Sequence, residues 1–144
     1  MIFSRLEASV KADEGLKLSP YLDIEKVWTI GYGSTFIGGA PVTEKTLPIS
    51  EAFALQLLRA ELFDSCLEAQ RFFPDLMELT DLRQEILAEM AYQLGLDGLS
   101  QFVHFRERLT AHDWQGAANH MRASKWHDET PDRVERLATL MAAG

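Results

Sequence analysis

The sequence has a single cysteine, Cys66, among its 144 residues, so no disulfide can form within the chain. This count fits a protein that folds in a reducing compartment, and it excludes small secreted folds that several disulfides hold together. Because Cys66 lies in an apolar helical pattern, we expect it to pack as a small hydrophobic side chain rather than to act as a nucleophile.

Long apolar runs are also missing, since the sequence contains no stretch of about 18 consecutive apolar residues. We therefore expect no stable insertion into a membrane. Residues 1 to 15 interrupt their apolar side chains with charged ones every few positions, which is unlike a signal peptide. We expect the chain to be made in the cytoplasm without a leader.

Clusters of basic side chains are absent as well. The formal net charge is −8, and Lys and Arg together number 14 against 22 Asp and Glu. Binding to a nucleic-acid backbone or to an anionic membrane surface needs clustered Lys and Arg side chains. We therefore expect neither nucleic acid nor a membrane surface as a partner.

Motifs for metals and cofactors are lacking too. The histidines, His104, His112, His120 and His127, stand seven or eight residues apart, which is not the spacing of zinc ligands. The run Gly31–Gly33 lacks the third glycine of a dinucleotide-binding fingerprint and does not follow a βαβ pattern. We expect no metal site and no cofactor.

Apolar residues make up 47 % of the chain, which is enough for one sizeable core, and their spacing predicts a mostly helical α+β fold. The predicted helices cover residues 2–13, 50–73, 81–94, 103–111 and 114–123, and a last helix begins at Thr130-Pro131. Residues 16–48 are rich in Gly, Pro, Tyr, Val, Ile and Thr and predict a sheet of two or three strands. We expect a single domain, 1–144, with a sheet-bearing lobe at about 14–49, a connecting helix at about 50–73 and a helical lobe at about 74–144. Helix 1–13 is expected to pack on the helical lobe.

Three local details follow from the same patterns. The apolar stripe expected on helix 50–73 consists of Phe53, Leu57, Leu58, Leu62, Cys66 and Leu67. Asp81 and Gln84 are spaced like a capping box at the start of the next helix, and Gly95 is its expected end. Trp126 is expected in the core rather than as a platform for a sugar ring.

Two carboxylates near the N-terminus are candidates for acid–base chemistry. Glu14 falls at the end of the first predicted helix, where the negative end of the helix dipole favours a protonated carboxyl group. Asp23 falls in a polar turn, where it should stay ionised, and Thr29 follows on a predicted strand, where its hydroxyl could hold a water. One protonated and one ionised carboxyl group are what glycoside hydrolysis requires. Solvated surface charges would show the same spacing, so the residues alone leave both interpretations open.

A family resemblance changes that balance. The pattern D-E-G-L-x-L-x-x-Y-x-D-x-x-x-x-x-T-I-G-x-G, residues 13 to 33, resembles the catalytic segment of the T-even phage lysozymes and phage endolysins, glycoside hydrolase family 24. Residues 90 to 95, MAYQLG, are similar to the family's M-x-x-Q-x-G helix end. Residues 124 to 133, SKWHDETPDR, are similar to its S-R-W-x-x-x-T-P-x-R motif. All three motifs occur in the family's order.

The resemblance implies a lysozyme-like fold, in which a long helix joins the two lobes. It also implies hydrolysis of the β-1,4 bond between N-acetylmuramic acid and N-acetylglucosamine in peptidoglycan strands. Glu14 would be the general acid, Asp23 and Thr29 would hold the attacking water, and the anomeric centre would be inverted. Arg133 would pair with Glu14. Among the positions that match the family's saccharide cleft are Gly33 and Gln93, with Tyr92 and Lys125 beside them.

The family's biology implies a monomer that leaves the cytoplasm through a holin-type lesion and acts on the periplasmic wall in host cell lysis. This chain departs from the pattern in its acidic charge, in Ser34 where the T-even enzymes carry histidine, and in Lys125 where the motif carries arginine. Two alternatives therefore stay open. One is a catalytically weak wall-binding module on a lysozyme fold, and the other is a glycosidase acting on chitin-type chains.

Overall fold

The computed structural model describes residues 1–144 and divides into two compact units. Ser4–Asp64 forms one, called here the sheet unit, and Met1–Phe3 with Ser65–Gly144 forms the other, called the helical unit. Seven α-helices and four short strands make up the chain, which confirms the predicted α+β class with mostly helical content. None of the helices is long and apolar enough to cross a membrane.

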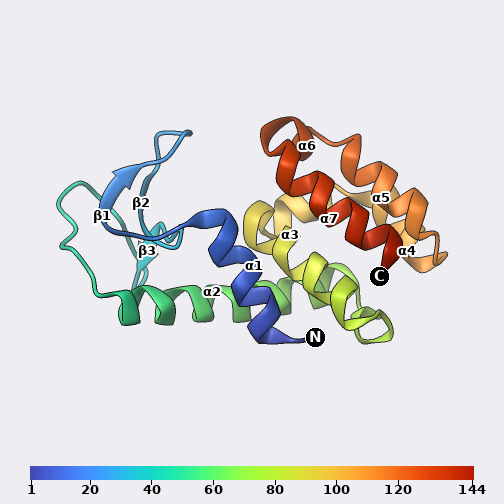
Figure 1. Ribbon diagram of the computed structural model, residues 1–144, viewed down its shortest axis with the longest axis horizontal. Helices are drawn as coiled ribbons and strands as arrows, with labels where there is room; N and C mark the ends of the chain where they lie inside the picture. The colour runs from blue at the N-terminus through green and yellow to red at the C-terminus, as the bar shows by residue number, and fades with distance from the viewer. The chain divides into compact units, whose positions relative to one another are not determined.

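In the sheet unit, helix α1 (Phe3–Glu14, its first residue assigned to the helical unit) ends where Gly15 takes a φ of +70°. Glycine adopts this left-handed conformation without steric cost, and its N–H donates to the carbonyl of Lys11 at 3.0 Å. The chain then forms the antiparallel strands β1 (Lys17–Leu22) and β2 (Trp28–Gly31), drawn in blue in Figure 1. Glu14, at the end of α1, and the turn between β1 and β2 therefore both lie in the sheet unit.

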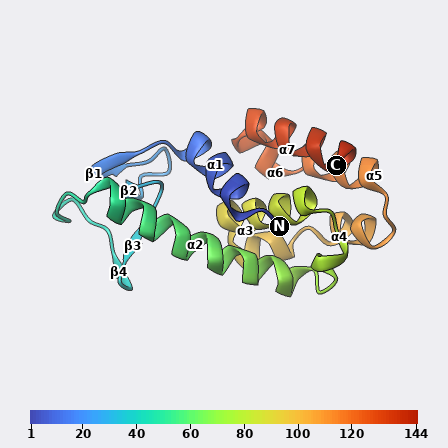
Figure 2. The ribbon, with the colours of Figure 1, turned by 60° about the horizontal axis from the view of Figure 1, so that its bottom comes forward.

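A second small sheet follows, made of β3 (Phe36–Ile37) and β4 (Ala40–Pro41). The two sheets are separate, so the prediction of one sheet with two or three strands was wrong in its grouping. In Figure 2, β3 and β4 form a short hairpin of their own. The turn at Gly38 and Gly39, both with positive φ, allows the chain to reverse over so few residues.

Helix α2 (Glu51–Phe72) begins after Ser50, whose hydroxyl oxygen accepts from the N–H of Phe53 at 3.1 Å. The start of α2 packs tightly on β2. The measure of this is that a Cβ added at Gly31 would lie only 3.2 Å from the Cβ of Ala54. Gly31 also has a φ of +67°, so both the close approach and the backbone favour glycine there.

The buried row of α2 confirms the predicted stripe at Leu58 and Leu62 but differs from it elsewhere. Its buried side chains recur every three or four residues, and all but the last are small or aliphatic: Ala54, Leu58, Leu62, Ser65, Ala69 and Phe72. Phe53 and Leu67, which were expected in the stripe, are 37 % and 47 % exposed. The prediction rested on apolar spacing, whereas close packing at this helix selects small residues that let neighbouring elements approach.

The helical unit contains the last part of α2, from Ser65 on, and then a 3-10 turn, Leu76–Glu78. It continues with α3 (Asp81–Ser100), α4 (Val103–Thr110), α5 (Trp114–Arg122), α6 (Lys125–Glu129) and α7 (Pro131–Ala143). Helix α3 is kinked at Gly95, whose φ of 71° and ψ of 169° are not helical, so the predicted end of the helix there is confirmed. The predicted capping box is wrong by one residue. Thr80 is the cap, and its hydroxyl oxygen accepts from the N–H of Arg83 at 3.3 Å.

One apolar cluster fills the helical unit. Phe105 stacks on Phe72 with ring centroids 6.4 Å apart, and Phe102 lies edge-on to Phe105 and to Trp126, at 6.0 and 6.3 Å. Trp126 is only 2 % exposed, which confirms its predicted place in the core. Cys66 is half-buried, with its sulfur 3.3 Å from that of Met1, and burial raises the pKa of its thiol. It packs as predicted rather than as a reactive thiolate.

Candidate active site

Glu14 is the last residue of α1 and is half-buried, whereas its neighbour Asp13 is exposed. The two side chains point in different directions because successive residues on a helix are about 100° apart. The adjacent acids thus have separate surroundings.

Asp23 lies at the start of the turn that joins β1 and β2. Its Oδ1 accepts two backbone hydrogen bonds, from the N–H of Glu25 at 2.8 Å and from that of Val27 at 2.9 Å. Lys26 sits in the left-handed region with a φ of 61°, which closes this tight turn. The turn therefore fixes the carboxylate through one oxygen and leaves Oδ2 outside these two bonds.

Thr29 lies on β2 and is 3 % exposed. Its hydroxyl donates to the carbonyl oxygen of Val27 at 2.9 Å, so its proton is already committed. A water bound to this hydroxyl would have to donate to it, because only the oxygen lone pairs remain. Such a water would turn its own lone pair toward another group.

Tyr21 is a residue that the sequence analysis did not single out, although it is the tyrosine of the 13–33 motif. It pairs across the hairpin with Thr29, and the ammonium of Lys17 lies 4.1 Å from the centre of its ring. Burial raises the pKa of its phenol, and the negative charges of Glu14 and Asp23 raise that pKa further. Both candidate carboxylates therefore act on one phenol, which stays protonated and able to donate a hydrogen bond.

Glu61 on α2 is a second group that no sequence motif indicated. Its pKa is raised mainly by burial and also by the charges of Glu14 and Asp64, while the nearby Ser34 opposes the shift. Ser34 itself is 1 % exposed. The buried Ser34 thus lies beside the carboxyl group of Glu61.

Three further predicted site residues are Gly33 in the sheet unit and Gln93 and Tyr92 in the helical unit. Gly33 follows β2 with a φ of 90°. In the helical unit, the side-chain oxygen of Gln93 accepts from the indole N–H of Trp126 at 2.8 Å, and its amide nitrogen donates to the Thr130 hydroxyl at 3.2 Å. Gln93 therefore ties α3 to α6. Tyr92, beside it, is half-buried.

Arg133 lies in the first turn of α7 with its side chain 9 % exposed. Its Nε lies 3.4 Å from Oε1 of the buried Glu89, and a nitrogen of Arg136 lies 3.2 Å from the same oxygen. Within the helical unit, Glu89 is thus the anchor of this arginine. The pairing of Arg133 with Glu14 joins residues of different units and stays a prediction.

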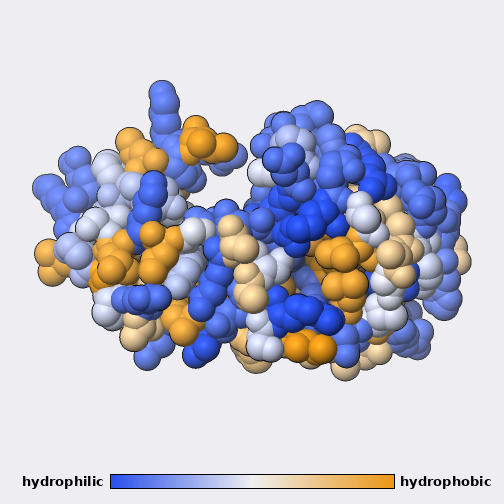
Figure 3. All heavy atoms as spheres, in the orientation of Figure 1, coloured by the Kyte–Doolittle hydropathy of each residue, from blue (hydrophilic) through white to orange (hydrophobic).

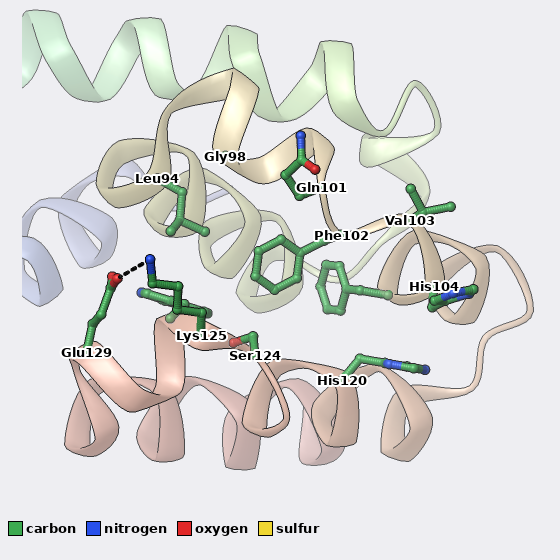
Figure 4. Close-up of a pocket in the computed structure, with 12 residues that line it drawn as sticks. Leu94, Gly98, Gln101, Phe102, Val103, His104, His120, Ser124, Lys125 and Glu129 are labelled. Atoms are coloured by element: carbon green, nitrogen blue, oxygen red, sulfur yellow. Dashed lines mark ion pairs between the residues drawn. The ribbon is translucent and has the colours of Figure 1, made fainter.

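A pocket of about 380 Å³ opens within the helical unit, between the end of α3, the start of α4, α5 and α6. Figure 4 shows Phe102 projecting into it, the imidazoles of His104 and His120 at one end, and Lys125 with Glu129 at the other. Lys125 is a predicted substrate-binding residue, and its ammonium lies 3.8 Å from a carboxylate oxygen of Glu129. No group of three or more His, Cys, Asp and Glu side chains anywhere in the chain is placed to hold a metal ion.

Comparison with known proteins gives a consistent set of similarities. The family model described as phage lysozyme matches residues 11–141. The chain is 26 % identical over 155 residues to the pre-baseplate central spike protein Gp5 of Enterobacteria phage T4, which covers 94 % of this chain but only 27 % of that protein. It is 25 % identical over 162 residues to probable T4-type lysozyme 1 of Dictyostelium discoideum, covering 98 % of this chain and 95 % of the relative. Probable T4-type lysozyme 2 of the same organism is also 25 % identical over 162 residues, and the match covers 98 % of this chain and 95 % of that protein.

Proposed function

Because the chain belongs to the phage lysozyme family, we propose that it is a muramidase that hydrolyses the β-1,4 bond between N-acetylmuramic acid and N-acetylglucosamine in peptidoglycan. The observation that carries the proposal is the grouping around Tyr21, since the charges of Glu14 and Asp23 both act on its phenol and Thr29 pairs with it across the hairpin. The family's catalytic glutamate, aspartate and threonine match Glu14, Asp23 and Thr29.

In the proposed reaction, Glu14 gives its proton to the glycosidic oxygen as the bond from that oxygen to the anomeric carbon breaks. A water attacks the same carbon from the opposite face and passes a proton to Asp23, so the product is inverted. The Thr29 hydroxyl, whose own proton is held by the Val27 carbonyl, would accept a hydrogen bond from that water and turn its lone pair to the sugar. The Asp23 turn supports this role by fixing one carboxylate oxygen and leaving the second for the water.

The wall is the proposed partner, and Gly33, Tyr92, Gln93 and Lys125 are the proposed saccharide contacts, with Arg133 as the partner of Glu14. We further propose release from the cytoplasm through a membrane lesion before the chain meets the wall. Because the net charge is −8, long-range attraction of the chain to an acidic wall should be weak or absent. Activity should therefore depend on ionic strength.

Substitution of the adjacent acids Glu14 and Asp13 tests the proposed role of Glu14. Glu14→Gln should lower the clearing of permeabilised Gram-negative cells by about 10²–10⁴-fold, the usual contribution of a general acid. Asp13→Asn removes a neighbouring carboxylate that is exposed and should leave activity near the wild-type level. Far-UV circular dichroism checks that both variants fold. Near-normal activity of Glu14→Gln would exclude this residue as the acid.

Product analysis separates the proposal from the alternatives. An α-anomer as the first product from the β-linked strand, read by NMR, would support direct displacement by water, and retention would overturn the mechanism. Binding to peptidoglycan fragments without new reducing ends would instead identify a non-catalytic wall-binding module. Cleavage of chitin-type chains in preference to peptidoglycan would point to a different glycosidase.

A further inference from the structure

Lys26, in the turn between β1 and β2, has a backbone conformation that lysine rarely adopts. Its φ is 61°, in the left-handed region, where an L side chain crowds its own backbone and glycine does not. Every other residue with a positive φ in the sheet unit is a glycine: Gly15, Gly31, Gly33, Gly38 and Gly39. Lysine therefore occupies this position at a cost to stability.

The hydrogen bonds of this turn show why glycine is the expected residue. The N–H of Asp23 donates to the carbonyl of Val27, and the N–H of Lys26 donates to the carbonyl of Asp23, both at 3.0 Å. These bonds enclose a three-residue loop whose last residue is left-handed, and glycine is the usual residue there. The backbone of the turn does not require a lysine, so the reason for Lys26 lies in its side chain.

The ammonium group of Lys26 is exposed and makes no ion pair, hydrogen bond or ring contact within the chain. Other basic side chains of the sheet unit have partners, since Arg59 and Lys11 pair with one glutamate and Lys17 lies over an aromatic ring. Only Lys45, in a turn before α2, is also exposed without such a contact. Lys26 thus combines an unfavourable backbone with a charge that the fold does not use.

Lys26 is also the one positive charge of the turn that holds Asp23. Residues 23 to 27 carry two acids, Asp23 and Glu25, and Lys26 as the only base. An anionic ligand that approaches Asp23 meets the repulsion of both carboxylates, and a cation on the same turn offsets part of it. The hydrogen bond from the Lys26 N–H keeps the two residues adjacent, and the flexible stem of lysine lets its ammonium reach a group bound beside Asp23.

We propose that Lys26 is a substrate-binding residue that pairs with a carboxylate on the muramic acid side chain of the wall strand, next to the bond that is cut. The carboxylate is either that of the lactyl group itself, where the stem peptide has been removed, or the first free one of the stem peptide. The proposal rests on the proposed function, which supplies the anionic strand and the role of Asp23. Lys26 thereby favours acidic wall strands over neutral chitin-type chains, although the chain as a whole carries a net charge of −8.

Glycine substitutions of the two unpartnered lysines test whether Lys26 is kept at a cost to stability. Lys26→Gly should raise Tm by about 2–5 °C, because glycine relieves the left-handed backbone. Lys45→Gly should leave Tm unchanged or lower it, because Lys45 does not have a positive φ and glycine there only adds freedom to the unfolded chain. Thermal unfolding of the full chain measures both values. An unchanged or lower Tm of Lys26→Gly would overturn the proposal, because the lysine would then stabilise the turn.

Binding of soluble wall strands tests the side chain, and it is measured in the Glu14→Gln variant so that no strand is cut. The probes are glycan strands with stem peptides, the same strands stripped of them by an amidase, and both kinds with their carboxylates converted to neutral amides. In calorimetric titrations at low salt, the carboxylate-bearing strands should bind about two- to fivefold more tightly than their amidated forms. Lys26→Gly should lose this preference, whereas Lys26→Arg and the control Lys45→Gly should keep it. Because salt screens exposed charges, about 0.5 M salt should abolish the preference.

The strands also identify which carboxylate is bound. A preference confined to stem-bearing strands assigns it to the peptide, and one confined to stripped strands assigns it to the lactyl group. Equal affinity for charged and amidated strands, or a preference that survives Lys26→Gly, would overturn the proposal. The release of new reducing ends by the wild-type chain is assayed separately. Cleavage without a preference that depends on Lys26 would remove only the lysine contact, and such a preference without cleavage would remove only the muramidase.

Discussion

The sheet unit and the helical unit differ in how they use buried polar side chains. In the helical unit these groups connect elements: Arg83 donates to the carbonyl of Met141 at 3.0 Å, and Gln84 donates to that of Leu79 at 2.8 Å. In the sheet unit the buried Thr29 and Ser34 belong instead to the neighbourhood of the candidate carboxylates. Polar burial therefore serves packing in one unit and the candidate site in the other.

Apolar side chains show the complementary difference. The core of the helical unit contains many large residues that are fully buried, such as Phe105, Met121 and Leu137. The sheet unit leaves Leu22, Ile24 and Phe36 exposed at 49 %, 92 % and 56 %, and Figure 3 shows several separate apolar patches over its strands. A unit with so few large buried side chains gains less from hydrophobic burial, so substitutions in the two units should differ in whether they reduce activity or stability.

The largest effect should come from Asp23→Asn in the sheet unit. Asparagine keeps an oxygen that can accept from the N–H groups of Glu25 and Val27, so the turn is preserved and only the charge is lost. Turnover should fall by about 10²–10⁴-fold, while the free energy of unfolding changes by no more than about 0.5 kcal/mol. Lysis assays and thermal unfolding measure the two quantities. If Asp23→Asn unfolded the chain but kept its activity per folded molecule, the division between the units would be wrong.

A matched pair of phenylalanines tests the other side of the comparison. Phe105→Ala removes a fully buried ring in the helical unit and should lower the free energy of unfolding by about 3–5 kcal/mol. Phe36→Ala removes an exposed ring in the sheet unit and should change it by less than about 0.5 kcal/mol. Chemical denaturation followed by circular dichroism provides both values. Equal losses would mean that Phe36 contributes to a core after all.

The sequence predicted the helices well because apolar periodicity and helix-ending glycines are local signals. Gly15 and Gly95 mark real interruptions, and the last helix does begin at Pro131. The α2 stripe was right at Leu58 and Leu62 but missed Ala54 and Ala69, because an apolar pattern cannot show which neighbour comes close enough to need a small side chain. Packing partners are a property of the folded chain rather than of the segment.

The candidate site was predicted more through family resemblance than through periodicity. Glu14, Asp23 and Thr29 stand in a spacing that solvated acids could also show, and the motif singled them out. Tyr21 was written in the same motif but carried no predicted role, because its significance depends on the charges that reach it in space. Glu61 had no local signal at all, since it contacts Ser34 from a helix far along the chain.

Glu61→Gln should give the smallest effect and the one of opposite sign. Burial, and with it the charges of Glu14 and Asp64, raises the pKa of Glu61 above its ordinary value of 4.5, so the folded state favours the protonated carboxyl. That contribution to stability is fully present below pH 4.5 and is lost as the pH rises through the raised pKa. Glutamine is neutral at every pH and has nearly the same shape as glutamate, so at neutral pH it avoids the cost of a half-buried charge.

The variant should therefore be more stable than the wild type at neutral pH, and the difference should disappear in acid. Because solvent screens a half-buried side chain, we expect a gain on the order of 0.5 kcal/mol, or about 2 °C in Tm. Thermal unfolding at about pH 7.5 and about pH 4 measures it, with the exposed Glu44→Gln as the control that should change neither value. A loss of stability at neutral pH would show that the Glu61 carboxylate holds the fold together. A gain accompanied by lower turnover would show that the sheet unit keeps this charge for its site at the expense of its own stability.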